Sequence, residues 1–313
     1  MSFAENPPAV QPLSTSELRK RILYALEQKT TGIARISFLT GEEMLLLISG
    51  GDIRQIYFKE KNVFRRSSGL WDEHLQAANP GHFAIQLMPM RRLFFEKAIL
   101  ETPEAGKEIK PTFKTSDLSG LFLSMVNLES ASLAHICWQT AEAFILVPGS
   151  KIPRRQAVFV SKNVTEENSA ALSCIQNHPG PKCDLTIYRG GIESEAWLEL
   201  HLNILFEWLC NYMLSEYGYL TGKVMVTSAA QNLMIFSSQS GWEVNRIGGE
   251  VADRTIFSSP AVAGDAYREM LALIGEHMTA VVGSTLFQSV KRQGLVSVNP
   301  FYQSLAKAYE LIQ

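Results

Sequence analysis

The chain has 313 residues, of which 46% are hydrophobic and 19% are charged, and its formal net charge at pH 7 is −2. These proportions are typical of a folded protein with two or three domains and exclude an intrinsically disordered chain. The nearly balanced charge argues against a general attraction to nucleic acid or anionic lipid, but it does not exclude a local basic patch.

Residues 1–12 lack the basic stretch and apolar run of a secretory signal, and we expect them to form a flexible tail. No run approaches the roughly 18 apolar residues that a membrane-spanning helix needs, so we expect a cytoplasmic protein. The cysteines are too few and too irregularly spaced for a disulfide framework, which predicts free, buried thiols. They are Cys137, Cys174, Cys183 and Cys210.

An internal repeat occupies the first two thirds of the chain. Thr15-Ser16-Glu17-Leu18 recurs as Thr115-Ser116-Asp117-Leu118, and Pro80-Gly81 recurs as Pro179-Gly180. Between these ends, further blocks match in the same order, with an offset that stays within one residue of 100. Such ordered matches predict two copies of one module, at residues 13–105 and 106–191.

Each copy has the pattern of a small α+β module. Thr15 is the predicted N-cap of a first helix, whose apolar face includes Leu18 and Ile22. Short β-rich runs follow at 33–38, 42–48 and 55–58, separated by glycine-containing turns. A second helix at 71–78 and a strand at 82–87 complete the first copy, and their counterparts in the second are 166–177 and 184–188.

This order of elements resembles the PATAN-type domain of bacterial signalling proteins. The residues that carry the resemblance are Thr31-Gly32-Ile33-Ala34-Arg35-Ile36, the stretch from Gly51 to Phe58, and Pro80-Gly81-His82-Phe83. In the second copy, Ser132 and Lys151-Ile152-Pro153 replace the glycine-bearing turns. The resemblance implies a non-enzymatic interaction module. The sequence contains no βα-repeating segment of the kind a receiver domain needs, so any phosphorylation input is expected from a partner.

Residues 192–313 are predicted to form a mainly helical domain. Apolar residues follow helical spacing from Trp197 to Met213, which predicts a helix that is deeply buried or part of an interface. A further helix is predicted from Lys223 to Ser238, with a strand after it. Ser259-Pro260 and Asn299-Pro300 mark the starts of two more helices, running to about Val282 and Leu311.

Basic pairs and exposed aromatic residues are the candidate partner-binding groups. Three basic pairs stand out: Arg65-Arg66, Arg91-Arg92 and Arg154-Arg155. They are consistent with solvated strand ends or with an electrostatic rim that binds an acidic protein. A nucleic acid contact is the third and disfavoured interpretation. The predicted partner-binding residues are Arg54, Tyr57, Arg65, Arg66, Arg154, Arg155, Trp197, Trp208 and Tyr212.

Other groups of residues have structural interpretations. Cys174, His178 and Cys183 match no common zinc spacing and favour a structural turn. Asp253-Arg254 is either a buried pair that fixes a loop or an exposed pair at a partner site. Gly190-Gly191 and Gly248-Gly249 indicate junctions or turns, because neither has the lysine of a phosphate-binding loop.

The sequence predicts a non-enzymatic adaptor without cofactors or metals. The six histidines are scattered, without a serine elbow or a paired carboxylate that indicates an active site. Expected partners are signalling or motility proteins, bound by the modules' exposed sheet edges and turns and by the C-terminal helices. The alternatives are a small-molecule sensor or enzyme with a pocket between the modules, and a homodimer formed through the C-terminal helices.

Overall fold

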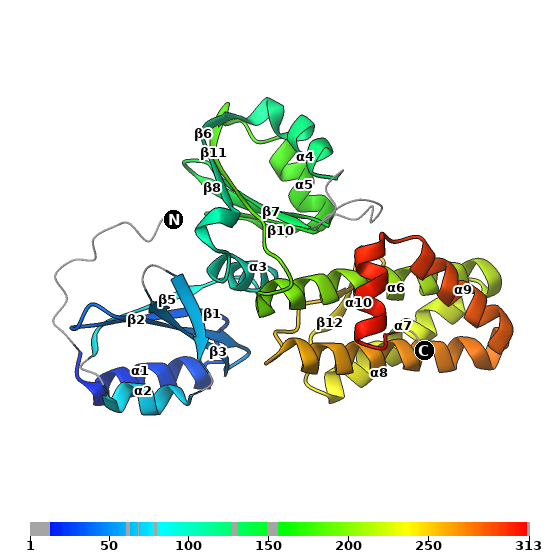
Figure 1. The fold of residues 1–313 in the computed structure, drawn as a ribbon, viewed down its shortest axis with the longest axis horizontal. Helices are drawn as coiled ribbons and strands as arrows, with labels where there is room; N and C mark the ends of the chain where they lie inside the picture. The colour runs from blue at the N-terminus through cyan, green and yellow to red at the C-terminus, as the bar shows by residue number, and fades with distance from the viewer. Residues whose placement is uncertain are drawn as a thin grey trace. The chain divides into compact units, whose positions relative to one another are not determined.

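A computed structural model describes residues 13–60, 63–67, 69–77, 80–126, 131–148 and 156–311 of the chain. The fold is α+β, with antiparallel sheets in the N-terminal part and a mainly helical C-terminal region (Figure 1). The chain divides into two compact units, Met1–Glu96 and Lys97–Gln313. The predicted tail, residues 1–12, lies outside the described residues. Among the described helices, none combines the length and apolar character that crossing a membrane requires.

The first unit is built around one five-stranded sheet. Its elements are α1 (Thr15–Glu27), β1 (Gly32–Phe38), β2 (Glu43–Ser49), β3 (Asp52–Glu60), β4 (Val63–Ser67), α2 (Trp71–Ala77), β5 (Pro80–Leu87) and the start of α3 (Met90–Leu100). The strand order is β4-β3-β2-β1-β5. Leu18 and Ile22 of α1 are fully buried in the core on one face of the sheet. The N-cap of α1 is Ser14, not Thr15, because the Ser14 hydroxyl accepts the Glu17 backbone N–H in a capping box.

Helix α3 corrects one interpretation of the sequence. Arg91 and Arg92 were expected at solvated strand ends or hairpin rims, but both lie on α3 and are buried, with 0% and 6% of their surface exposed. Arg92 pairs with Glu96 one turn later, with 3.4 Å between Nε and Oε1. Since a buried guanidinium must be paired, this basic pair is part of the fold and not an exposed rim.

The second unit begins with a six-stranded sheet. Its elements are η1 (Glu104–Gly106), β6 (Lys107–Lys114), η2 (Thr115–Asp117), α4 (Leu118–Val126), β7 (Ser132–Cys137), β8 (Ala141–Val147), β9 (Gln156–Ser161), β10 (Thr165–Glu167), α5 (Asn168–Gln176) and β11 (Lys182–Tyr188). The strand order is β10-β9-β8-β7-β11-β6, which repeats the order of the first sheet and adds β6 beside β11. Helices α4 and α5 cover one face, where Phe122 and Ile175 are buried against Ile145.

The C-terminal region contains five helices and a hairpin among the described residues. They are α6 (Glu195–Thr221), α7 (Lys223–Gln239), β12 (Val244–Ile247), β13 (Glu250–Asp253), α8 (Pro260–Val282), α9 (Ser284–Val296) and α10 (Pro300–Ala308). Ser259 and Asn299 cap α8 and α10 as predicted, although α10 ends three residues before the expected Leu311. Gly248 and Gly249 form the hairpin turn, with φ of 61° and 91° that favour glycine.

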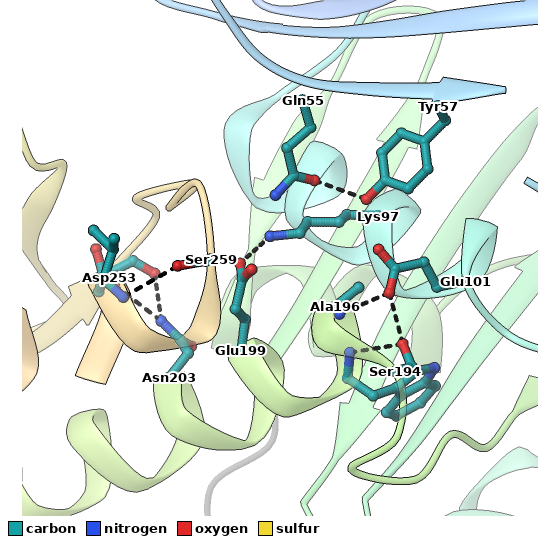
Figure 2. A network of polar contacts seen from close by, with 12 residues as sticks. Gln55, Tyr57, Lys97, Glu101, Ser194, Ala196, Glu199, Asn203, Asp253 and Ser259 are labelled. Carbon is teal, nitrogen blue, oxygen red and sulfur yellow. Dashed lines mark hydrogen bonds and ion pairs between the residues drawn. The ribbon is translucent and has the colours of Figure 1, made fainter. Parts of the chain in front are cut away.

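Asp253 and Arg254 bind different partners. Asp253 is fully buried and accepts hydrogen bonds from the Tyr267 hydroxyl at 2.6 Å and from the Thr255 backbone N–H at 2.8 Å. The Asn203 amide of α6 also donates to it, at 3.3 Å (Figure 2). Arg254 instead pairs with Glu167 of the second sheet. The two residues therefore do not pair with each other, as the first alternative predicted, but Asp253 is buried and its hydrogen bonds fix this loop.

The last turn of α3 is bonded to the first turns of α6. Lys97 and Glu199 form an ion pair in which each side chain is only 1% exposed. The Glu101 carboxylate accepts from the Ser194 hydroxyl and from the Ala196 backbone N–H, both at 2.8 Å (Figure 2). Glu101 therefore supplements Ser194 in satisfying the free N–H groups at the start of α6.

Candidate functional site

The edge of the first sheet at β5 is the strongest candidate interaction site. In the second sheet, β11 pairs with β7 on one side and with β6 on the other. In the described part of the chain, β5 pairs only with β1 and ends the sheet. A strand with one free side presents backbone N–H and C=O groups to an incoming strand.

The two sheets can be compared position by position, because their registers match. Phe83 of β5 pairs with Ile36 of β1, and Leu185 of β11 pairs with Ile136 of β7. Ile36 and Ile136 are equivalent residues of the repeat. Phe83 and Leu185 therefore occupy the same place in the two modules.

Among the described residues the first sheet has no sixth strand beside β5, and apolar surface there is uncovered. Leu185 and Ile187 are fully buried, whereas their equivalents Phe83 and Ile85 are partly exposed. In the second sheet β6 lies alongside β11, and its Phe113 packs against the core there. A strand placed beside β5 would bury the same positions of the first sheet.

The two edge strands also differ in protection. Strand β6, the edge strand of the second sheet, carries Lys107, Lys110, Lys114 and Pro111, which are residues that discourage edge pairing. Residues 82–87 of β5 contain neither proline nor a lysine, arginine or carboxylate. Pro80 and a break in the register beside it protect only the start of β5, so residues 82–87 lack the usual devices that keep an edge strand unpaired.

A groove of 590 Å³ runs between α1 and β5. Leu87 and Tyr24 lie in it with 68% and 63% of their surface exposed, beside Phe83. Lys20 and Arg21 of α1 line the same groove and are exposed. Hydrogen bonds from Ser14 and then the charges of both cations lower the pKa of the nearby Glu17 carboxylate of α1, and the groove combines an apolar floor with these positive charges at its margin.

Four of the residues predicted to bind partners lie elsewhere on the first sheet: Arg54, Tyr57, Arg65 and Arg66. Tyr57 is fully buried, and its hydroxyl donates to Gln55 at 2.7 Å. Arg54 pairs with Asp52 at 3.2 Å, while Arg65 is exposed and Arg66 is half-buried on β4. The remaining pair, Arg154 and Arg155, lies outside the described residues.

The predicted aromatic residues lie on α6. Trp197 is fully buried and donates its indole N–H to Thr102 at 2.9 Å. Trp208 is half-buried and donates to the Gly294 carbonyl at 3.3 Å, and burial raises the pKa of the half-buried Tyr212. Most of α6 is buried, so of the two alternatives for this helix the structure supports burial.

A second groove, of 830 Å³, lies among helices of the C-terminal region. Its floor is apolar and comes from α6, α8 and α9, through Leu209, Met213, Leu271 and Phe287. Lys291 lines it with its ammonium 5.8 Å from the centre of the Phe287 ring, and burial lowers the pKa of this lysine. The volume is within the range of small-molecule pockets.

Within the described residues, one group of side chains has the spacing of metal ligands: His135, Cys137 and Glu142. Cys174, His178 and Cys183 do not form such a group; His178 stacks on Trp138 at 4.2 Å. All four cysteines are free, but Cys137 and Cys174 are only half-buried.

Some of these features leave a signal in the sequence. His135 and Cys137 alternate on a predicted strand, and Glu142 follows the next turn, which places all three on one face. Phe83 and Ile85 alternate as core residues do, so nothing local indicates that they lack a neighbouring strand. No family model, curated protein or solved structure matches the chain. The resemblance to PATAN-type domains therefore stays a prediction.

Proposed function

We propose that this chain is a non-enzymatic, cytoplasmic adaptor in bacterial signal transduction that binds an extended segment of a protein partner along β5. One observation carries the proposal: among the described residues, positions 82–87 of β5 form an unprotected edge in the first module, at the place where β6 completes the second. Strand addition to a sheet edge is a recurring mode of peptide recognition, in which main-chain hydrogen bonds give affinity and alternate side chains give specificity.

The groove beside β5 indicates the chemistry of the bound segment. Phe83, Ile85 and Leu87 favour apolar side chains at alternate positions, because these point to one face of a strand. Lys20 and Arg21 favour acidic residues at its margin, which would steer association more than they strengthen it. The PATAN-like pattern supports the same class of function, an interaction module of a signalling protein.

The test is site-specific photo-crosslinking in the host cell. A photoreactive amino acid replaces Leu87 in one variant and Ile109 in the other. These residues are matched, because both lie on edge strands and are 68% and 69% exposed, but Ile109 lies on the protected strand β6. We expect position 87, and not position 109, to link to an extended segment of one partner, identified by mass spectrometry of the joined peptides.

Three outcomes would contradict the proposal or its placement at β5. Equal labelling of the same proteins from positions 87 and 109 would mean that the contacts are nonspecific. Linkage of position 87 only to residues 1–12 of the same chain would mean that the edge is filled internally. A Leu87→Glu variant that still retains the linked partner at unchanged affinity would also remove the groove from the binding surface.

A small-molecule sensor is the second candidate, favoured by the groove in the C-terminal region. Ala272 is exposed and lines this groove, whereas Ala261 is exposed on the same helix outside it. Ala272→Trp should therefore abolish stabilisation by any bound metabolite in a thermal-shift screen, and Ala261→Trp should not. Dimerisation through the C-terminal helices is a further prediction, which light scattering of the full chain tests.

A further inference from the structure

Three potential metal ligands meet on one face of the second sheet. His135 and Cys137 are two residues apart on β7, so their side chains point to the same side. Cys137 pairs directly with Glu142 of β8, which brings the carboxylate beside the thiol. The donor atoms of the three residues all lie within 4.8 Å of one another.

Two of the three distances between donor atoms are close to those of a coordination shell, and the third is at most 4.8 Å. His135 Nε2 lies 3.3 Å from Glu142 Oε2 and 3.2 Å from Cys137 Sγ. Zinc–nitrogen and zinc–oxygen bonds of about 2.0–2.2 Å and zinc–sulfur bonds of about 2.3 Å give tetrahedral edges of roughly 3.3–3.6 Å. One ion can therefore reach all three atoms with small side-chain movements.

A single ring nitrogen faces both the thiol and the carboxylate. Nε2 of a neutral imidazole carries either a proton or a lone pair, so it donates to Glu142 or accepts from Cys137. A metal cation can accept a lone pair from the imidazole, the thiolate and the carboxylate at the same time. The His135 ring is held for this role by stacking on Phe144, with ring centres 4.3 Å apart and 6° between the planes.

The first module shows what the same position does without metal-ligand chemistry. There Arg35 and Lys59 pair with Glu43, at 2.5 and 3.3 Å. In the second module, the equivalent of Arg35 is His135, and Val160 lies opposite the carboxylate where Lys59 is expected from the repeat. Glu142 thus takes the place of Glu43, but the two cations that pair with Glu43 in the first module are replaced, the arginine by His135 and the lysine by Val160.

We propose that His135, Cys137 and Glu142 bind one divalent transition-metal ion of the zinc class. Imidazole, thiolate and carboxylate are all ligands that Zn²⁺ accepts, and three protein ligands leave a fourth position for water or an external group. The His135 and Glu142 side chains are 23% and 12% exposed, so an ion can enter from solvent. Binding releases the thiol proton, and affinity should therefore increase with pH.

The experiment adds Co²⁺ to the purified full-length chain and records the thiolate-to-cobalt charge-transfer absorption. Cys137→Ser is the test variant, because the first module carries Ser37 at the equivalent position and folds around it. Cys174→Ser is the matched control, since Cys174 is the other half-buried cysteine of the same module. We expect the band in the wild type and in Cys174→Ser, and its loss in Cys137→Ser.

A second variant guards against a folding defect. His135→Arg recreates the arginine–carboxylate pair of the first module, so it should fold and yet bind metal more than about tenfold more weakly. Zn²⁺ should raise the melting temperature of the wild type and leave that of His135→Arg unchanged. Absence of both the cobalt band and the Zn²⁺-dependent stabilisation in the wild type would overturn the proposal, as would a band that depends on Cys174 instead of Cys137.

Discussion

His201 is a buried histidine whose protonation should control stability in acid. Its Nδ1 lies 3.1 Å from the Tyr302 hydroxyl, and burial lowers the pKa of the imidazole to about 4. The unfolded chain takes up this proton near pH 6.5, so acid favours unfolding as the pH falls from 6.5 to 4. A shift of this size corresponds to about 3 kcal/mol of unfolding free energy.

His201→Asn tests this prediction. Asparagine retains a donor near Tyr302 but has no titrating ring, so the variant should be less stable at neutral pH and should lose less stability between pH 6.5 and 4. Denaturant unfolding of both proteins at several pH values measures the difference. Parallel pH profiles for the two proteins would show that His201 does not contribute.

Asp253 should change the unfolding free energy with pH in the direction opposite to His201, making the fold more stable as the pH falls. Burial raises the pKa of this carboxyl from 3.8 to about 6, although its hydrogen bonds from Thr255 and Tyr267 oppose the shift. A raised folded pKa means that the contribution is fully present below pH 3.8 and is lost as the pH rises through 6, by about 3 kcal/mol in total. The exposed Asp265, on α8, offers a control.

Comparing Asp253→Asn with the wild type separates the pH dependence caused by Asp253 from that caused by His201. We expect Asp253→Asn to remove the loss of unfolding free energy between pH 4 and 6 relative to the wild type, whereas Asp265→Asn keeps the wild-type profile. The Asn variant also loses an acceptor, which lowers its stability at pH 4 by about 1–3 kcal/mol. A wild-type pH dependence in Asp253→Asn would contradict the assignment.

At the scale of elements, strands β5 and β11 should differ in hydrogen exchange. Backbone amides in residues 184–188 lie between two strands, while those in residues 82–87 have one neighbouring strand among the described residues. Exchange should therefore be slower in β11, since exposed edges open at lower free energy. Strands β1 and β7 are central in their sheets and serve as references. Equal protection of β5 and β11 would indicate that the β5 edge is already occupied.

Elements with terminal signals were predictable from the sequence, and elements defined by their neighbours were not. Ser259-Pro260 and Asn299-Pro300 fixed two helix starts because capping is local chemistry. Strand β6 alternates Ile109 and Phe113 with charged residues, but Pro111 between them argues against a strand, and only the pairing with β11 shows an edge position where proline is tolerated. Helix α9 was not predicted: it follows Gly283 directly, and no capping side chain marks its start, although the end of α8 at Val282 agrees with the prediction.

The sequence predicted the kind of site proposed here, an exposed sheet edge, but it did not predict which edge. Exposed sheet edges were expected to bind partners, but the residues chosen for this role were arginines and aromatics such as Tyr57 and Trp197. Both are fully buried, because large aromatic side chains that look suited to an interface are equally suited to a core. The β5 edge is open because no other strand of the described part of the chain pairs with it, and this tertiary property has no local sequence pattern.

At the scale of the whole molecule, the ion pair between Lys97 and Glu199 joins the end of α3 to the C-terminal helices. Lys97→Met leaves the buried Glu199 carboxylate without this ammonium, and should lower the unfolding free energy of the second unit by about 3 kcal/mol or more. The double variant Lys97→Met/Glu199→Leu should recover much of that loss, because it removes both buried charges. Denaturant unfolding of the single and double variants checks both statements, and equal stabilities of wild type and Lys97→Met would refute them.

The unprotected β5 edge also bears on solubility. An edge that accepts a partner's strand equally accepts the same edge of another copy, and its backbone groups make no distinction between the two. Apolar Phe83, Ile85 and Leu87 favour such edge-to-edge association, which grows with protein concentration. A partner segment bound along β5, as proposed above, would also shield this edge, and the supply of that partner would then set how much of the chain stays dispersed.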